Sequence, residues 1–204
     1  MNSSTRSAGR TLWVAVRAMA VFTLLCGLGY TLVVTGIGQL VFPGQANGSL
    51  VTDSDGEVVG STLIGQGFVD ENGDPLPEYF QSRPSAAGDG WDGASSSGTN
   101  LGPENEDLVA AIEQLRQEIA EFDGVSVEDV PADAVTSSAS GLDPDISPEY
   151  AAIQVDRIAA ARGLSVAEVE DLVAAHTDGR DLGYLGEPTV NVLELNLALD
   201  ELKG

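Results

Sequence analysis

Acidic and amide side chains at alternating positions could bind calcium in the stretch DENGDPLPEYFQ. Asp70, Asn72 and Asp74 occupy the first three alternating ligand positions of a twelve-residue calcium loop. Such a loop also needs glycine at its sixth position and a bidentate glutamate at its twelfth, where this chain has Pro75 and Gln81. We therefore interpret this stretch as a polar turn and predict no metal site.

The residue types needed for hydrolytic or zinc chemistry are scarce. The single histidine, His176, lies at the end of the apolar stripe of an expected helix, and no serine or cysteine motif accompanies it. The only lysine is Lys203, and the only cysteine, Cys26, lies in an apolar run far from His176. We interpret His176 as a partly buried structural side chain, and we predict no catalytic residue, no zinc site and no internal disulfide.

The stretch GQANGS, residues 44–49, resembles two short motifs. A phosphate loop needs glycine where this stretch has Ser49, followed by a lysine that is missing here. Asn47-Gly48-Ser49 is a glycosylation sequon, but such sequons often occur by chance. Because Pro43-Gly44 should end the preceding apolar helix, we interpret the stretch as a junction that leads into the first strand.

A charge-free apolar run, residues 18–42, divides the chain. At ~1.5 Å per residue, its roughly 25 residues span a hydrocarbon core of ~30 Å. Arg6, Arg10 and Arg17 precede the run without any acid, whereas all 32 Asp and Glu follow it with only six Lys and Arg. The charge asymmetry predicts residues 1–17 in the cytoplasm, a membrane helix at 18–42, and residues 43–204 as one domain outside.

Two alternatives to an uncleaved anchor follow from signal sequences. A cleaved secretory signal has an apolar core of about 7 to 15 residues and a small-x-small cleavage site, and neither is present. A lipoprotein signal around Cys26 would need a small residue where this chain has Leu25. We therefore predict an anchor, in which Gly29 and Gly36 lie seven residues apart on one helix face and allow another membrane helix to dock.

Strand signals come first in the outer part. SLVTDSDGEVVGSTLIG has short apolar runs on both sides of Asp55-Gly56, a pattern typical of a β-hairpin. Residues 67–103 are rich in Gly, Ser, Asp and Pro but also contain aromatic residues. Since a linker needs no aromatic side chains, we predict that this segment is a long ordered loop.

Helix signals follow within residues 103–124, 147–163, 164–179 and 191–203. The first segment has an apolar stripe of Leu108, Ile112, Leu115, Ile119 and Phe122. Ser147 and the pair Ser165 and Glu168 predict the caps of the second and third helices. The last segment predicts a broad core-facing side made of Val192, Leu193, Leu195, Leu197, Leu199 and Leu202. Strands followed by helices indicate an α+β domain on one transmembrane helix.

Six runs of residues resemble one known family in the same order along nearly the whole chain. They are QANGSL (45–50), GSTLIGQGF (60–68), YFQSRPSA (79–86), SGTNLGPEN (97–105), VPADAVTSSASGLDPDISPEYAAIQVDRIAAARGLS (130–165) and PTVNVLELNLALD (188–200). On these runs the chain resembles the KdpC family, the C subunit of the bacterial high-affinity potassium-transporting P-type ATPase.

The resemblance implies a non-catalytic subunit of a potassium uptake pump in the bacterial plasma membrane. Its implied partners are a channel-like subunit (KdpA), an ATP-hydrolysing subunit (KdpB) and a small membrane peptide (KdpF). ATP and K⁺ would be used by the complex, and the family is described as raising the ATP affinity of the pumping subunit. An outside domain cannot meet cytoplasmic ATP directly, so its acidic surface instead suggests a cap that gathers cations near the channel entry. A tethered binding module and an extracellular hydrolase remain as alternatives, and the acidic charge excludes nucleic acid as a partner.

Polar residues in loops with apolar neighbours are the candidate contact positions, because such groups need partners. They are Gln45, Asn47, Arg83, Ser138, Ser140 and Asp143. Each could contact another subunit or fix the conformation of its own loop. Both interpretations stay open from the sequence.

Overall fold

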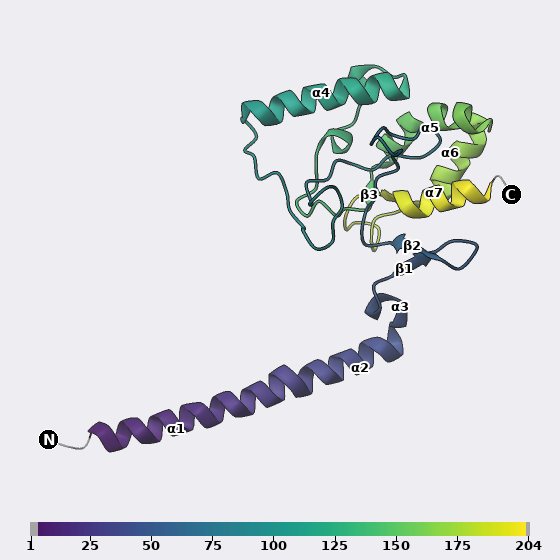
Figure 1. Cartoon of the computed structure of the whole chain (residues 1–204). Coiled ribbons are helices and arrows are strands. Elements are labelled where there is room, and N and C mark those ends of the chain that lie inside the picture. Colours follow the sequence, from purple (N-terminus) through teal and green to yellow (C-terminus); the bar gives the residue numbers. More distant parts are fainter. Residues whose placement is uncertain (1–3, 203–204) are drawn as a thin grey trace. The chain divides into compact units, whose positions relative to one another are not determined.

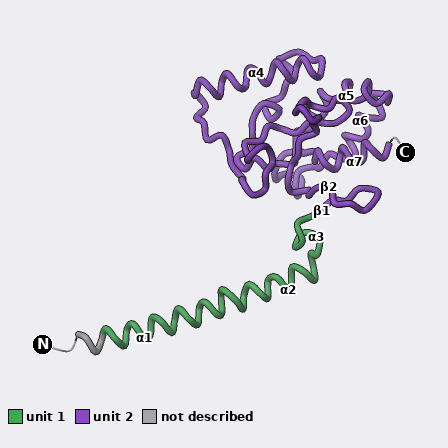
Figure 2. The backbone as a smooth tube through the Cα atoms, viewed as in Figure 1, with its two compact units in different colours: residues 1–49 green, residues 50–204 purple. Residues whose placement is uncertain are grey.

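The computed structural model describes residues 4–202, and the chain divides into two compact units (Figure 2). The first unit is Met1–Ser49 and the second is Leu50–Gly204. Each unit has its own secondary structure. Together they confirm the predicted fold class, an α+β domain joined to one long apolar N-terminal helix.

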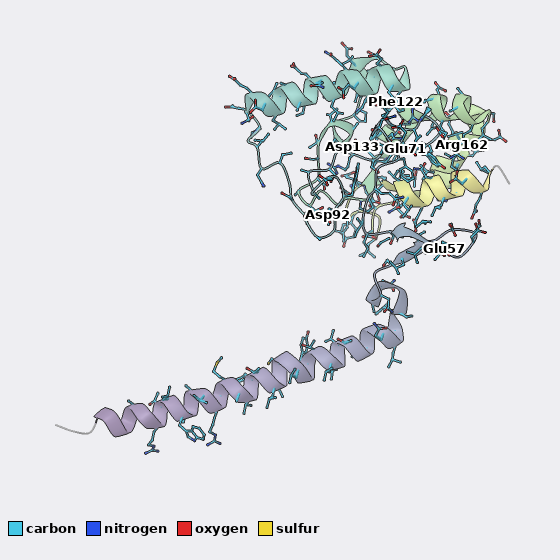
Figure 3. All side chains as sticks on the ribbon, in the orientation of Figure 1. Glu57, Glu71, Asp92, Phe122, Asp133 and Arg162 are labelled. Carbon is cyan, nitrogen blue, oxygen red and sulfur yellow. The ribbon has the colours of Figure 1, made fainter. Side chains whose placement is uncertain are left out.

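The first unit is almost entirely one apolar helix, made of α1 (Ser4–Phe22), a π-helical stretch η1 (Thr23–Tyr30) and α2 (Thr31–Val41). Within it, Ala8–Val41 is long and apolar enough to cross a membrane, and none of this helix is buried within the chain. Its side chains project outward along its length (Figure 3). The π-helical stretch, which the sequence did not predict, contains Cys26 and Gly29.

The junction forms where the sequence predicts it. Phe42 leaves the helical conformation with φ −131°, and Pro43 occupies the first turn of α3 (Pro43–Ala46), where its missing N–H costs nothing. Gly48 and Ser49 then take positive φ values of 93° and 49°. The first strand begins directly after these two residues, at Leu50.

The second unit opens with the predicted hairpin. β1 (Leu50–Thr52) pairs antiparallel with β2 (Val58–Ser61). The Asp53 carboxylate accepts two backbone amides of the connecting turn at 3.0 and 2.9 Å, and Gly56 takes a φ of 84°. Between β2 and residue 106 the chain forms no helix and only isolated β-bridges, and this loop packs on the domain as predicted, with Phe80 fully buried.

A second sheet, which the sequence did not predict, joins distant parts of the chain. β5 (Thr189–Asn191) lies between β3 (Asp145–Ile146) and β4 (Thr177–Asp178), and both pairings are antiparallel. Strands of two or three residues are too short to show a periodic pattern. Ile146 and Val190, which face each other in this sheet, are buried in the core.

All four predicted helices form in this unit. They are α4 (Glu106–Asp123), α5 (Pro148–Arg162), α6 (Val166–Ala175) and α7 (Val192–Glu201), with two short 3₁₀ turns, η2 (Val127–Asp129) and η3 (Asp133–Val135), between α4 and α5 (Figure 1). The hydroxyl of Ser147 accepts the Tyr150 amide at 3.0 Å, and Ser165 and Glu168 form the expected capping box. These caps depend only on neighbouring residues.

The core is built mainly by α5, α6, α7 and β5. Its largest fully buried apolar side chains include Phe80, Ile158, Leu195 and Leu199. One part of the prediction is wrong: Leu202 is 46% exposed at the end of α7 and Leu197 is only half-buried. Asn196 is buried in their place, because its amide binds the backbone of the long loop. The stripe on α4 contacts the core with half-buried side chains.

Candidate functional site

The side chains of Asp70 and His176 both make contacts with the backbone of their own segments. The Asp70 carboxylate accepts the amides of Asn72 and Asp74 at 2.8 and 2.9 Å, so it closes a polar turn. These hydrogen bonds, the one from Asp74 first, hold the pKa of Asp70 below its usual value. His176 is half-buried at the end of α6, with its Nδ1 2.9 Å from the Leu172 carbonyl, as the structural interpretation predicts.

Four of the six candidate contact residues gather around the loop that precedes β3. Arg83 reaches this loop from the long loop and pairs with Asp143 at 2.7 Å. Its Nε and Nη2 donate to the Thr136 carbonyl at 3.1 and 2.9 Å. One guanidinium therefore joins both ends of the segment 136–143. Burial raises the pKa of nearby Asp145, and the negative charge of Asp143 adds to this effect.

The serines of this loop bind backbone amides. Ser138 Oγ accepts the Gly141 amide at 2.9 Å, and Ser140 Oγ accepts the Leu142 amide at 3.1 Å. Gly141 has φ 67°, and a Cβ there would lie 2.6 Å from the Ser97 carbonyl oxygen. These contacts all fix the loop itself. A role in contacting a partner stays a prediction for Arg83, Ser138, Ser140 and Asp143.

The other two candidates belong to the first unit. Asn47 donates to the Pro43 carbonyl at 2.7 Å and to Gln39 Oε1 at 3.1 Å, so its amide closes the turn after α2. Gln45 is exposed in α3. Gly29 and Gly36 are exposed in η1 and α2, and a Cβ at Gly36 would meet nothing within 4 Å. Docking through these two glycines also stays a prediction.

The loop segment 79–81 is held by two buried amide side chains that the sequence analysis missed. Asn196 accepts the Phe80 amide and donates to the Phe80 carbonyl, both at 2.9 Å. Gln154 makes the same pair of contacts with Gln81, at 2.7 and 3.2 Å. Each side-chain amide thus satisfies one backbone N–H and one backbone carbonyl of the loop, as a neighbouring strand would. A polar residue inside an otherwise apolar helix face was the available signal.

Two arginines with buried side chains connect the same loop to the helices through hydrogen bonds and ion pairs. Arg157 pairs with Asp123 at 2.7 Å and donates to the Pro77 and Tyr79 carbonyls at 2.6 and 3.0 Å. Arg162, labelled in Figure 3, donates to the Glu78 carbonyl at 2.7 Å and pairs with Asp200 at 2.8 Å. Arg180 also pairs with Glu187. Four cations, Arg83, Arg157, Arg162 and Arg180, are therefore paired with acids of the same domain.

An exposed apolar turn, residues 181–185, forms the tip of the β4–β5 hairpin. Leu182 and Tyr184 are 82% and 68% exposed. The Tyr184 amide donates to the Asp181 carbonyl at 3.2 Å, and Leu182 and Gly183 both have positive φ, 54° and 83°. This is the geometry of a type I′ turn, which normally carries Asn or Gly where this chain has Leu182. Leu182 thus combines a strained backbone with an apolar side chain that the described chain leaves uncovered.

Comparison with known proteins decides the family. The model of the family described as "KdpC: K+-transporting ATPase, c chain" matches residues 12–201. The chain belongs to the KdpC family. Among similar proteins, the "Potassium-transporting ATPase KdpC subunit" of Caulobacter vibrioides is 52% identical over 187 residues, which cover 91% of this chain and 90% of that protein.

Two further KdpC relatives give the same result. The KdpC subunit of Myxococcus xanthus is 52% identical over 198 residues, covering 95% of this chain and 89% of the relative. That of Mycobacterium tuberculosis (strain CDC 1551 / Oshkosh) is 50% identical over 194 residues, covering 95% and 99%. The resemblance inferred from the six sequence runs is therefore confirmed. KdpC membership also makes this chain a membrane-associated transport subunit with one candidate spanning helix.

Proposed function

We propose that this chain is the non-catalytic C subunit of an ATP-driven potassium uptake pump. The match to KdpC over residues 12–201 carries this proposal. In this proposal the channel-like subunit KdpA conducts K⁺, KdpB hydrolyses ATP, and KdpF completes the membrane assembly. The present chain binds them and supports either ATP turnover or potassium entry.

The proposed topology is a single span of the bacterial plasma membrane. The arginines that precede the charge-free run 18–42 keep the N-terminus in the cytoplasm, and the acidic domain lies outside. The length of the apolar helix supports the single span, and the charge asymmetry alone supports its direction. The domain boundaries in this proposal are 1–17, 18–42 and 43–204.

Purification from membranes tests the assembly. The tagged chain is expressed with KdpA, KdpB and KdpF of its own genome and isolated in mild detergent. We expect the three partners to co-purify, and potassium-stimulated ATPase activity to require this chain. Recovery of the chain alone, together with full ATPase activity of a preparation that lacks it, would contradict the proposal.

The acidic surface supports a role near potassium entry. α4 carries five exposed acids, Glu106, Asp107, Glu113, Glu118 and Glu121. Such a surface raises the local cation concentration, and salt screens the effect beyond about 10 Å at 0.1 M ionic strength.

Neutralising this face should weaken potassium capture. We expect Glu106→Gln, Asp107→Asn, Glu113→Gln and Glu121→Gln combined to raise the apparent half-saturating K⁺ concentration about twofold at low ionic strength. The difference should vanish in 0.5 M choline chloride, where the Debye length is roughly 4 Å. The measurement is potassium-stimulated ATPase activity of the complex. An unchanged potassium affinity at low salt would refute the cation-gathering role while leaving the assembly intact.

A further inference from the structure

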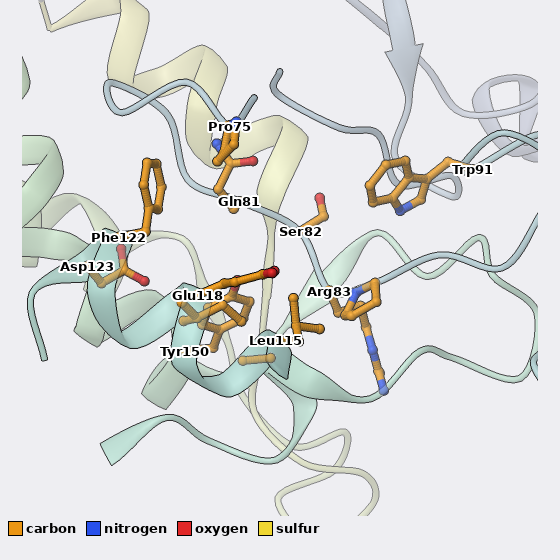
Figure 4. A pocket seen from close by; sticks show the side chains of 13 residues that line it. Pro75, Gln81, Ser82, Arg83, Trp91, Leu115, Glu118, Phe122, Asp123 and Tyr150 are labelled. Atoms are coloured by element: carbon orange, nitrogen blue, oxygen red, sulfur yellow. The ribbon is translucent and has the colours of Figure 1, made fainter. Parts of the chain in front are cut away.

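A cavity of about 270 Å³ lies between α4 and the loop segment 81–84 (Figure 4). α4 contributes Leu115, Ile119 and Phe122, while Trp91 closes the end opposite Phe122. Ala134 adds a further apolar side chain, and the lining also includes the polar residues Gln81, Ser82, Arg83, Glu118 and Asp123. An apolar cavity of about 150 Å³ already holds a benzene ring, so this one has room for a substituted ring.

One polar group in the cavity lacks a partner. Tyr150 lines the cavity and is only 3% exposed, yet its hydroxyl makes no hydrogen bond to any residue that the structure describes. The hydroxyl is not sealed from solvent, because Arg116 Nε is the only sealed, unpaired side-chain atom among the described residues, so the hydroxyl can exchange a water molecule for a polar group of a ligand. Burial raises the pKa of Tyr150, so the hydroxyl stays neutral and can both donate and accept. A ligand with one hydrogen-bonding group could therefore replace water at this hydroxyl.

The charges around the cavity restrict the ligand further. Arg83 is neutralised by Asp143 at 2.7 Å, and Asp123 by Arg157 at the same distance. Glu118, which lines the cavity from α4, is exposed and has no ion pair among residues 4–202. The remaining charge is negative and disfavours carboxylate or phosphate groups.

The position of Trp91 at the cavity is fixed by its own contacts. Its amide donates to Ser85 Oγ at 2.8 Å, and its backbone has φ 50°, which is rare for a bulky residue. The indole covers Gly65 and Gly67 so closely that a Cβ at either would lie 2.7 or 2.8 Å from it. Such strain persists only where the surroundings enforce it, as at ligand sites.

We propose that this cavity binds a small free ligand with one apolar ring and one neutral or cationic hydrogen-bonding group, which meets the Tyr150 hydroxyl. The site goes beyond the subunit role proposed above and does not depend on it.

The test uses the full chain in lipid nanodiscs and 2-(4-fluorophenyl)ethanol as the probe, observed by ¹⁹F NMR against empty nanodiscs. We expect saturable binding near about 1 mM, as for a ligand of this size. Tyr150→Phe should weaken it about two- to tenfold by removing one hydrogen bond, without lowering the thermal midpoint. The anion 4-fluorophenylacetate should not bind. Leu115→Trp, which fills the cavity, should abolish binding, whereas Gln117→Trp on the exposed side of α4 should not.

Three outcomes would overturn the proposal. The first is no saturable signal above empty nanodiscs. The second is equal affinity in the native chain, Tyr150→Phe and Leu115→Trp. The third is binding by the isolated chain but not by the complex purified from membranes, which would mean that a side chain of a partner fills the cavity instead of a free ligand.

Discussion

Replacing Arg157 by leucine is expected to lower the free energy of unfolding of the domain by about 3 to 5 kcal/mol. The Arg157 and Asp123 side chains are only 7% and 2% exposed. Removing the guanidinium leaves a carboxylate buried without its cation, and it also removes the hydrogen bonds to the Pro77 and Tyr79 carbonyls. It further ends the contact with the Phe122 ring, whose centroid lies 4.4 Å from the guanidinium carbon. Urea unfolding of the full chain in detergent, followed by the change in tryptophan fluorescence that Trp91 contributes beside Trp13, measures the loss.

The matched control is Arg180→Leu, which breaks the pair with Glu187. Both side chains there are largely exposed, 43% and 74%, so we expect a loss of less than about 1 kcal/mol. Adding Asp123→Asn to Arg157→Leu should restore part of the stability, because an amide is cheaper to bury than a charge. Equal losses for Arg157→Leu and Arg180→Leu would contradict a structural role for the buried pair.

The same substitution should make stability depend on pH. Burial raises the pKa of Asp123 above its usual value even with Arg157 present, although the hydrogen bond from Arg157 opposes this. Without that opposition, the folded-state pKa of Asp123 rises further above the unfolded value. A raised pKa gives stability that is present at low pH and lost as pH rises through the folded pKa. The defect of Arg157→Leu should therefore be smaller at pH 5 than at pH 8.

The helices were predictable because their signals are local. The Ser147 cap, the box formed by Ser165 and Glu168, and the left-handed Gly163 each depend on residues within one helical turn. The hairpin around Asp55-Gly56 is local in the same sense. The family resemblance also came from contiguous runs, so local order was sufficient to identify it.

The rest could not be predicted because it depends on residues far apart in the chain. Gln154 and Asn196 contact loop residues 73 and 116 positions away. Within its own helix, each is only a polar residue on an otherwise apolar face. The ion pair of Arg83 with Asp143 spans 60 positions, although both residues were chosen as candidates. The cavity needs α4, the long loop and Tyr150 together, and no one segment indicates it.

Removing the apolar groups of the turn 181–185 is expected to abolish assembly with the pump partners. Leu182→Asn keeps the turn, since Asn tolerates positive φ, and Tyr184→Ser removes the exposed ring. Burying two such side chains at an interface is worth about 3 kcal/mol or more, so we expect the affinity to fall at least about a hundredfold and the proposed partners KdpA and KdpB to be lost on co-purification.

We infer the occupant of this turn from charge. A second copy of the strongly acidic domain would repel the first, as would an anionic lipid surface, and beside the turn Asp178 and Asp181 remain as net negative charge after Arg180 pairs with Glu187. An apolar pocket on a neutral or basic partner subunit would cover Leu182 without charge repulsion.

The control is Leu101→Ser with Val109→Ser, two substitutions at apolar positions that are each 43% exposed and lie outside the turn. For this variant we expect normal co-purification. Leu182 and Tyr184 contribute little to the folded core, so the turn variant should keep the native unfolding midpoint. Loss of assembly at an unchanged midpoint would therefore indicate a lost contact surface and not a folding defect.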